Sequence, residues 1–482
     1  MLIQDRNTSG APRGSTMARK KITGHDLMEL GFPAGKVIGL TISLMQKHYT
    51  YLTAGAQLEL LKQALQAPQE YQAHAGLSEI LTELVKHQQN FVPALVLQPT
   101  PKPYGIFGTT IIETDAREQM DLAMRLPVAV AGALMPDAHK GHGLPIGGVL
   151  ATHQAVIPYA VGMDIACRMH FTLYNIPATV LEQKKLPLRQ ALAQQTRFGV
   201  NTGFEKPQTH EVFDRPEFNE IKILRQLKTR AAHQLGSSGT GNHFVEFGAV
   251  NLPAPNEFGL SAGEYLGILS HSGARSLGKN IAAYYTQIAM DTCRLPVEAK
   301  YLAWLDLQTQ AGQEYWRAMQ VADAYARACH EQIHARLSAN FGEAPVLTID
   351  SPHNFAWQEQ YQGREVIVHR KGAGKATAGA LNIIPGSMTQ PGYLVRGLGK
   401  PEAIYSSSHG AGRALTARQA TQVLYQTEMN NILKAFGVEL MGGSLQESPM
   451  AYKNMHHVME SQQEQVEILG TFAPRIIRMD RF

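Results

Sequence analysis

The sequence predicts an α+β fold, with a small helical module ahead of a larger domain that mixes strands and helices. Three observations support this fold class. Apolar residues recur at helical spacing from Ile22 to about Leu97, short apolar runs typical of strands begin after Pro99, and amphipathic stretches alternate with glycine-rich loops in that second part. We therefore expect a disordered start at residues 1–20, a helical extension at 21–98 and one main domain at 99–482.

The helical extension has apolar residues three or four positions apart, as at Leu58, Leu61 and Leu65. Its first part, residues 22–36, resembles a short helical element of tRNA nucleotidyltransferases. Because the match is short, we favour a packing role for this module over RNA binding.

The main domain is expected to place its chemistry on loops between strands and scaffold helices. We expect strands at four apolar runs: Val128–Leu134, Val346–Ile349, Glu365–His369 and Tyr393–Val395. We expect helices at four amphipathic stretches: Phe218–Leu235, Glu314–Ala339, Ala417–Phe436 and Ala451–Leu469.

The composition is that of a globular enzyme, with 44% hydrophobic residues, 17% charged residues and 43 glycines among 482 residues. A net charge of +4 is too small to indicate nucleic-acid binding by itself. Cys167, Cys293 and Cys329 lie far apart and form no disulfide framework, which favours a reducing cytoplasm. The sequence contains no signal peptide and no apolar run of membrane-spanning length, so we expect a cytoplasmic protein.

Residues 330–334, His-Glu-Gln-Ile-His, match the helix motif of zinc proteases, in which two histidines four apart share one face. That motif also needs a third ligand and a cleft. Because it lies here within a long amphipathic stretch, we interpret His330 and His334 as part of a solvated helix face.

Neither a P-loop nor the Lys-x-Asp-Gly motif of lysine-nucleotidylating ligases occurs in the sequence, so the usual signatures of those two enzyme classes are absent.

Two segments before residue 170 are candidates for ligand binding. Residues 135–148 contain Asp137 and a Pro-Ile-Gly-Gly run, and this density of glycine and proline is typical of a loop that lies against a ligand. Asp164 and Cys167 follow, three residues apart, a spacing that can bring both side chains to one centre at a turning strand end. Alone, such a pair is usually structural, with the cysteine buried as a small hydrophobe.

Three histidines in loops of small residues favour a metal centre instead. His243 follows Gly241-Asn242, His271 begins the run His-Ser-Gly-Ala-Arg, and His353 lies in Ser-Pro-His-Asn. One aspartate, one cysteine and three histidines supply enough ligands for two metal ions if the thiolate bridges them. Thiolate favours zinc, whereas carboxylate with imidazole also suits manganese, so the residues alone predict a divalent transition metal.

The last block of motifs surrounds His409, which lies between three serines and a Gly-Ala-Gly run. Such a histidine is sterically free, so its imidazole can attack an α-phosphate and form a phosphoramidate. Arg370, Lys371 and Arg413 are candidates to hold the phosphoryl charge, together with backbone N–H groups of the glycine turns. The alternative is that the glycine-rich loop is only a turn.

Taken together, these motifs resemble the RtcB family of RNA ligases, in that family's order and from about Pro99 to the C-terminus. The matching blocks are Asp137 with the following Pro-Ile-Gly-Gly, Asp164-x-x-Cys167, Gly241-Asn-His243, His271-Ser-Gly-x-Arg275, His353-Asn354, His369-Arg-Lys-Gly372, Pro385-Gly-Ser-Met388 and His409-Gly-Ala-Gly-Arg413. The resemblance implies a central β-rich core surrounded by helices.

The resemblance also implies a GTP- and manganese-dependent reaction that joins an RNA 3′-phosphate or 2′,3′-cyclic phosphate end to a 5′-hydroxyl end, in tRNA splicing or RNA repair. By match to the family motifs, Cys167 would bridge two Mn²⁺ ions and His409 would carry GMP. The other metal ligands would be Asp164, His243, His271 and His353. The residues around the nucleotide would be Asn242, Asn354, Pro385, Gly386, Ser387, Gly412 and Tyr452. Supporting residues would be Asp137, Arg275, Arg370, Lys371, Arg413 and Glu447.

Two departures from the family pattern affect the nucleobase pocket. The family's chain ends in Lys-Gly, whose lysine meets guanine, whereas this chain ends Arg478-Met-Asp-Arg-Phe482. A serine common in the family after Pro-Gly-Ser-Met falls at Gly392. The preference for guanine over adenine therefore stays open, with Arg478 and Glu447 as candidates to replace the lysine.

Two other functions are alternatives at this point. One is a metal-dependent cyclic phosphodiesterase that uses the same ligands without joining ends, and the presence of His409 favours ligation over it. The other is a catalytically inactive RNA- or nucleotide-binding protein, against which the complete ligand set argues. The residues do not identify the natural RNA, the oligomeric state or any separate activator protein.

Overall fold

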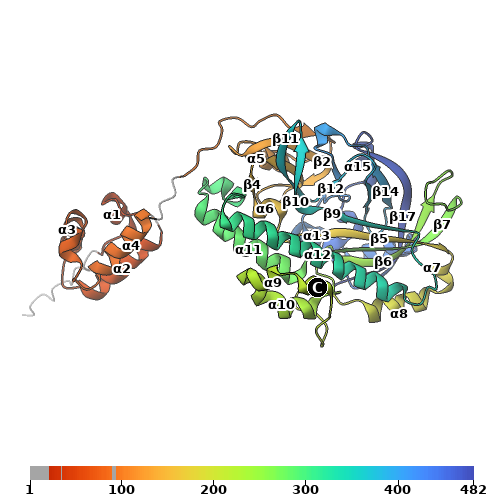
Figure 1. The fold of residues 1–482 in the computed structure, drawn as a ribbon, viewed down its shortest axis with the longest axis horizontal. Coiled ribbons are helices and arrows are strands. Elements are labelled where there is room, and N and C mark those ends of the chain that lie inside the picture. The colour runs from red at the N-terminus through yellow and green to blue at the C-terminus, as the bar shows by residue number, and fades with distance from the viewer. Residues whose placement is uncertain (1–20, 34, 90–93, 482) are drawn as a thin grey trace, which may run out of the picture. The chain divides into compact units, whose positions relative to one another are not determined.

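The computed structural model describes residues 21–33, 35–89 and 94–481, so the disordered start expected at residues 1–20 lies outside the described residues. The chain divides into two compact units, Met1–Pro93 and Ala94–Phe482 (Figure 1). Within the described ranges, no helix is long and apolar enough to cross a membrane.

The first unit contains helices where the periodicity predicted them. They are α1 (Gly24–Glu29), α2 (Lys36–His48), α3 (Ala54–Gln66), the 3₁₀ turn η1 (Pro68–Tyr71) and α4 (Leu77–Gln89). Thr23 begins α1 with a capping box, in which its hydroxyl accepts from the Asp26 N–H and the Asp26 carboxylate accepts from the Thr23 N–H. Leu27, Val37 and Leu61 are buried in one apolar cluster, so the helices turn their apolar faces towards one another.

Two sheets form the centre of the second unit (Figure 1). The five-stranded sheet has the order β1 (Gly105–Ile106), β2 (Ala129–His139), β3 (Ile146–Thr152), β11 (Arg364–Lys371), β10 (Asn354–Tyr361). The eight-stranded sheet has the order β13 (Leu381–Ile384), β14 (Gly392–Gly397), β17 (Val466–Met479), β6 (Phe244–Leu252), β7 (Gly263–Ser272), β5 (Arg168–Pro177), β9 (Leu347–Pro352), with β16 (Glu439–Met441) also paired to β17. Two short pairs are β12 (Ala373–Lys375) with β15 (Ser406–Ser408) and β4 (Ala155–Val156) with β8 (Leu305–Asp306).

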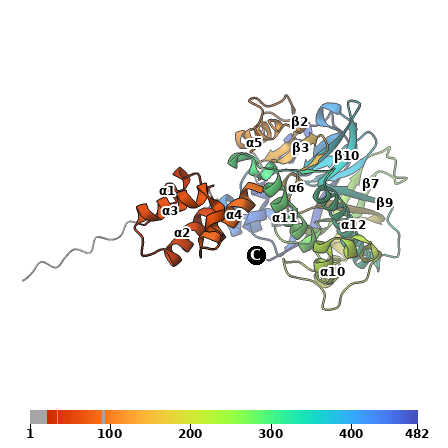
Figure 2. The ribbon, with the colours of Figure 1, turned by 60° about the vertical axis from the view of Figure 1, so that its left-hand side comes forward.

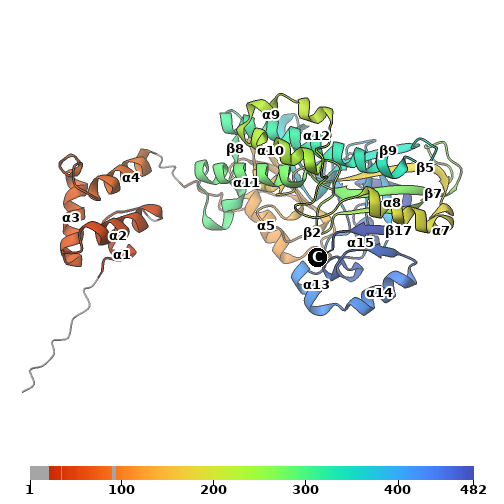
Figure 3. The ribbon, with the colours of Figure 1, turned by 90° about the horizontal axis from the view of Figure 1, so that it is seen from below.

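Helices cover these sheets, which confirms the α+β class (Figures 2 and 3). The α-helices are α5 (Thr114–Met124), α6 (Pro158–Val161), α7 (Val180–Gln183), α8 (Lys185–Gln195), α9 (Glu217–Glu220), α10 (Lys222–Gln234), α11 (Arg275–Thr292), α12 (Gln310–Ser338), α13 (Ala417–Val423), α14 (Gln426–Ala435) and α15 (Met455–Glu460). The 3₁₀ turns are η2 (Glu211–Asp214), η3 (Val297–Leu302), η4 (Pro401–Ala403), η5 (Leu445–Glu447) and η6 (Pro449–Ala451). Figure 3 shows α9 to α12 on one side of the strands and α13 to α15 on the other.

Most predicted elements are present, but the helix expected at Ala451–Leu469 is wrong for most of its length. Only Met455–Glu460 is α-helical there, after the 3₁₀ turn η6 that ends at Ala451, and the long strand β17 begins at Val466. Apolar residues in this stretch fit a helical period locally, but from Val466 onward many alternate positions are buried as β17 pairs with β14 and β6. Tertiary pairing therefore overrides the local pattern. The stretch Ala417–Phe436 forms two helices, α13 and α14, rather than one.

The prediction that His330 and His334 face solvent is also wrong. Their exposed fractions are 0% and 3%, and both rings lie on the side of α12 that packs against the eight-stranded sheet. The error arises because the charged neighbours Arg327 and Arg336 made this face of the helix look polar and exposed. Instead, α12 buries the two polar rings of His330 and His334 against the sheet.

Candidate metal centre and nucleotide pocket

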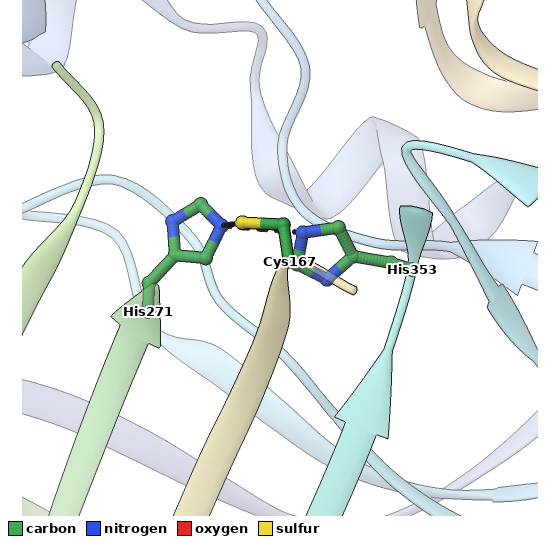
Figure 4. Close-up of side chains that lie close together, drawn as sticks. All are labelled: Cys167, His271 and His353. Carbon is green, nitrogen blue, oxygen red and sulfur yellow. Dashed lines mark hydrogen bonds between the residues drawn. The ribbon is translucent and has the colours of Figure 1, made fainter. Parts of the chain in front are cut away.

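Three predicted ligands meet where strands of the eight-stranded sheet end. Cys167 directly precedes β5, His271 lies near the end of β7, and His353 directly follows β9 (Figure 4). Cys167 Sγ lies 3.1 Å from His271 Nε2, which in turn lies 3.2 Å from His353 Nε2. Because β5 is antiparallel to both neighbours, its start lies beside their ends, and this pairing brings the three side chains together.

A second group of ligands shares the same cysteine. The Nε2 atom of His243 lies 2.8 Å from Asp164 Oδ2 and 3.4 Å from Cys167 Sγ. The two sets, Cys167 with His271 and His353 and Asp164 with Cys167 and His243, each have the geometry to hold one ion. The arrangement therefore suits two ions with Cys167 between them.

The loops around these ligands are shaped by close packing. A Cβ atom added at Gly273 would lie 2.1 Å from Asp164 Oδ1, and one at Gly239 would lie 1.9 Å from His243 Nδ1. Ala166, just before Cys167, has a φ of 61°, and its N–H donates to the Asn354 carbonyl at 2.8 Å. This strained backbone turns the cysteine towards the histidines.

Hydrogen bonds and burial favour unprotonated ligand atoms. The Nδ1–H of His271 donates to the Asn242 carbonyl at 3.0 Å, which leaves the Nε2 lone pair facing Cys167. Burial lowers the pKa of His271 and of His353 well below the ordinary value, so both rings are neutral at pH 7. These lone pairs, a thiol and a carboxylate are a donor set that fits divalent transition metals.

The carboxyl and the thiol respond to burial differently. Burial works against ionisation of Asp164, but His243 beside it holds the pKa of that carboxyl below its ordinary value. Burial, and after it the charge of Asp164, raises the pKa of the Cys167 thiol well above its ordinary value. A bound cation would reverse the effect on the thiol, because it stabilises the thiolate.

His409 follows β15 and faces the five-stranded sheet. The fully buried carboxylate of Asp137, on β2, accepts from His409 Nδ1–H at 2.6 Å and from the His409 backbone N–H at 3.1 Å. The ring of His409 has its centre 4.9 Å from that of His353. With Nδ1 protonated, the Nε2 atom carries the lone pair that is available for chemistry.

A pocket of about 400 Å³ adjoins His409 and His271. The predicted nucleotide residues that line it are Asn242, Pro385, Gly386, Ser387, Gly412 and Tyr452. Arg413 and Glu447 line it too, and the guanidinium of Arg413 lies over the Tyr452 ring while its NH1 is 3.3 Å from the Glu447 carboxylate. The volume lies within the range of nucleotide-sized ligand sites.

Glu246 is a pocket residue that the sequence reasoning missed. It projects from β6 beside Ile477 of β17, and Phe244, Phe472 and Met479 also line the pocket. Its exposed fraction is 4%, and burial raises the pKa of its carboxyl well above the ordinary value. The sequence does carry a signal for Glu246. Side chains two residues apart on a strand share a face, so Glu246 lies on the same face as Phe244, which pairs with the ligand His271 on β7.

Four predicted residues have structural partners outside the pocket lining. Arg370 is fully buried and pairs with Glu359, so the prediction that it holds phosphoryl charge is wrong. Lys371 Nζ donates to the His142 carbonyl at 2.6 Å, and burial lowers its pKa to about 7. Asn354 accepts from the Gly372 N–H at 2.8 Å, and Arg275 donates to the Ser237 hydroxyl at 3.1 Å.

The two departures from the family pattern are placed differently. Gly392 lines the pocket. Arg478 does not: its guanidinium donates to the carbonyls of Leu192 and Ala193, and it lies over the ring of Phe198. The suggestion that Arg478 replaces the family's lysine is therefore wrong, and Glu447 remains at the pocket wall.

Comparisons with known proteins agree with the family resemblance of the sequence. The family model described as tRNA-splicing ligase RtcB matches residues 119–477. The RNA-splicing ligase RtcB of Escherichia coli (strain K12) is 32% identical over 391 residues, covering 75% of this chain and 93% of the relative. The tRNA-splicing ligase RtcB of Thermococcus kodakarensis is 30% identical, covering 68% and 82%, and the RNA-splicing ligase RtcB of Mycobacterium tuberculosis is 30% identical, covering 69% and 92%. The chain belongs to the RtcB family of RNA-splicing ligases.

Proposed function

We propose that this protein is an RNA ligase that joins a 3′-phosphate or 2′,3′-cyclic phosphate end to a 5′-hydroxyl end, with GTP and two Mn²⁺ ions as cofactors. The observation that carries the proposal is the position of His409. Its Nε2 lone pair is free while Asp137 holds Nδ1, and it lies beside both the nucleotide-sized pocket and the ligand His353.

The metal ions have assigned ligands in this proposal. Asp164, Cys167 and His243 hold one ion, and Cys167, His271 and His353 hold the other. When bound, the ions supply Lewis acidity to the phosphoryl oxygens and orient an in-line displacement. The ligand types also suit other divalent metals, and manganese follows from the family.

His409 acts as the nucleophile. Its Nε2 attacks the α-phosphorus of GTP, a P–N bond forms, and pyrophosphate leaves. Asp137 stabilises the positive charge that the ring gains, because its carboxylate accepts the Nδ1–H bond.

Three displacements then complete the ligation. Water attacks a cyclic phosphate, the bond from phosphorus to the 2′-oxygen breaks, and a 3′-phosphate and a 2′-hydroxyl result. An oxygen of the 3′-phosphate attacks the phosphorus of the histidine adduct and releases the His409 imidazole. The RNA 5′-hydroxyl attacks the activated 3′-phosphate, a phosphodiester forms, and GMP leaves.

Glu246 supports guanine as the base in this pocket. A carboxylate offers two acceptors, which match the N1–H and N2–H donors on the Watson–Crick edge of guanine. The two guanine donors stabilise the ionised form of Glu246 against burial, which raises the pKa of this carboxyl in the free protein. Adenine presents one donor and one acceptor on that edge, so it stabilises the ionised carboxylate less. In this proposal Glu246 selects guanine.

The experiment that tests the proposal is incubation of the protein with Mn²⁺ and each α-labelled nucleoside triphosphate, followed by denaturing electrophoresis. We expect covalent label from GTP and ligation of RNA with matching ends. Opening of cyclic phosphates without any covalent label would support the phosphodiesterase alternative. Binding of nucleotide or RNA with no reaction would support an inactive binding protein.

A further inference from the structure

A buried layer of polar side chains lies behind the metal centre. Along β5, Cys167 and Met169 face the centre, whereas Arg168, His170 and Thr172 point to the opposite face of the sheet, which α12 covers (Figure 1). On β7, Ser270 and Ser272 flank the ligand His271 and point the same way as that second group. The exposed fractions are 0% for Arg168, Ser270 and His330 and 3% for His170 and His334.

The hydrogen bonds in this layer form a chain with one direction. His330 Nε2 lies 3.1 Å from the Ser272 carbonyl, which can only accept, so His330 donates there. Its Nδ1 therefore accepts from the Ser270 hydroxyl at 2.6 Å.

The chain continues to the next ring of α12. Since Ser270 has used its only proton, its oxygen accepts from His334 Nε2–H at 2.8 Å, and His334 Nδ1 accepts from the Thr172 hydroxyl at 2.9 Å. Both rings are neutral in this pattern. Burial agrees, because it lowers the pKa of His330 to about 3 and that of His334 well below the ordinary value.

The same helix bonds to all three strands that end at the metal centre. Arg168, next to Cys167 on β5, pairs with Asp323 of α12 and lies 2.7 Å from Asp350 of β9. Arg327 of α12, whose side chain is 54% exposed at the rim of this layer, also reaches Asp350, at 3.2 Å. Together with the bonds to Ser270 and Ser272, these contacts tie α12 to β5, β7 and β9 within three residues of Cys167, His271 and His353.

A layer of this kind has an energetic cost that apolar packing avoids. Buried charges and polar groups lose hydration, and replacing them with well-packed apolar side chains is often neutral or stabilising. Their distinguishing property is direction, because each bond fixes a distance and an angle, whereas apolar contacts tolerate sliding. Groups that hold metal ligands in orientation typically change metal affinity about 10–100-fold when removed.

We propose that the polar stripe of α12, made of Asp323, Arg327, His330 and His334, is a positioning device that holds the ends of β5, β7 and β9 so that their metal ligands converge. The inference rests on the metal centre of the proposed function. It also gives the histidines of the His-Glu-Gln-Ile-His sequence a role other than binding a separate metal ion. Among the described residues, His330 and His334 belong to no group with metal-binding geometry.

Cobalt binding by the full-length apoprotein tests the proposal, with readouts that do not depend on activity. Co²⁺ is titrated while the thiolate-to-cobalt absorption of Cys167 is recorded, and thermal unfolding of each apoprotein is measured in parallel. His330→Leu removes the chain while keeping bulk. His330→Gln keeps a donor for the Ser272 carbonyl, and Ile333→Val alters a buried apolar residue on the same helix as a matched control.

We expect His330→Leu to weaken cobalt binding about 10–100-fold and to change the absorption band. His330→Gln should recover most of the affinity, and Ile333→Val should lower the unfolding temperature while its affinity stays that of the wild type. Wild-type affinity in His330→Leu, or an equal loss in Ile333→Val, overturns the proposal. If His330→Leu does not fold, Ser270→Ala removes the same bridge and carries the same expectation. A wild-type protein that binds no cobalt would count against the metal centre itself.

Discussion

Replacing Asp137 with asparagine isolates the electrostatic part of its contact with His409. Both bonds from His409 reach one oxygen of a fully buried carboxylate, at 2.6 and 3.1 Å. An amide can keep both bonds but loses the charge. The backbone bond is the same in the ground state and the transition state, so only the bond from the ring affects the rate. A bond from the positively charged ring to a carboxylate is worth roughly 1 kcal/mol more than one to a neutral amide, so labelling by GTP should slow about fivefold.

The assay is single-turnover labelling with α-labelled GTP and Mn²⁺ at saturation, with thermal unfolding as the folding control. Asp115→Asn is the matched variant, because Asp115 forms an exposed ion pair with Lys140 and should not affect labelling. Asp137→Asn should still seal RNA whose 3′-phosphate already carries GMP, since that step does not use His409. A labelling rate within twofold of wild type, or an equal loss in the sealing step, would contradict this role of Asp137.

Three further predictions concern the ligands, the base and pH. Cys167→Ala should lose both metal ions and ligation together, which elemental analysis checks, and full metal content would contradict the bridging role. Glu246→Gln should reduce the preference for GTP over ATP in labelling by about tenfold, since an amide offers guanine one acceptor and one donor in place of the two acceptors of a carboxylate. An unchanged ratio would exclude Glu246 from base selection. Burial lowers the pKa of His330 to about 3 and of His369 to about 4. Between these values and the unfolded pKa of about 6.5, the unfolded chain binds more protons than the folded protein does. The apoprotein should therefore lose roughly 1.4 kcal/mol of stability per pH unit for each ring as pH falls below about 6.5. Denaturant unfolding at pH 7, 6 and 5 measures this, and constant stability would contradict neutral buried rings.

Sequence patterns predicted the parts of the site that depend on short loops. Asp164 and Cys167 lie three residues apart on one strained turn, and each of His243, His271 and His353 sits at a strand end beside small residues. Such positions are specified locally. The helical spacing of the first unit is local as well, and α1 to α4 confirm it.

Three of the wrong predictions depend on contacts between distant segments. β17 follows a stretch with helical spacing, but pairing with β14 and β6 makes it a strand. His330 and His334 look solvated until β5 and β7 are placed against α12. Arg370 looks free until Glu359 pairs with it across β10 and β11. The residues next to each of these positions in the sequence do not predict its contacts, because the order of the strands in the sheets determines which distant residues meet.

Labelling followed by acid treatment tests most directly whether His409 carries the nucleotide. We expect that α-labelled GTP labels the wild-type protein and that acid removes the label while base does not. We also expect that His409→Ala takes no label yet seals RNA already activated with GMP. Label that persists in His409→Ala, or wild-type protein that ligates RNA without ever taking label, would contradict this role of His409.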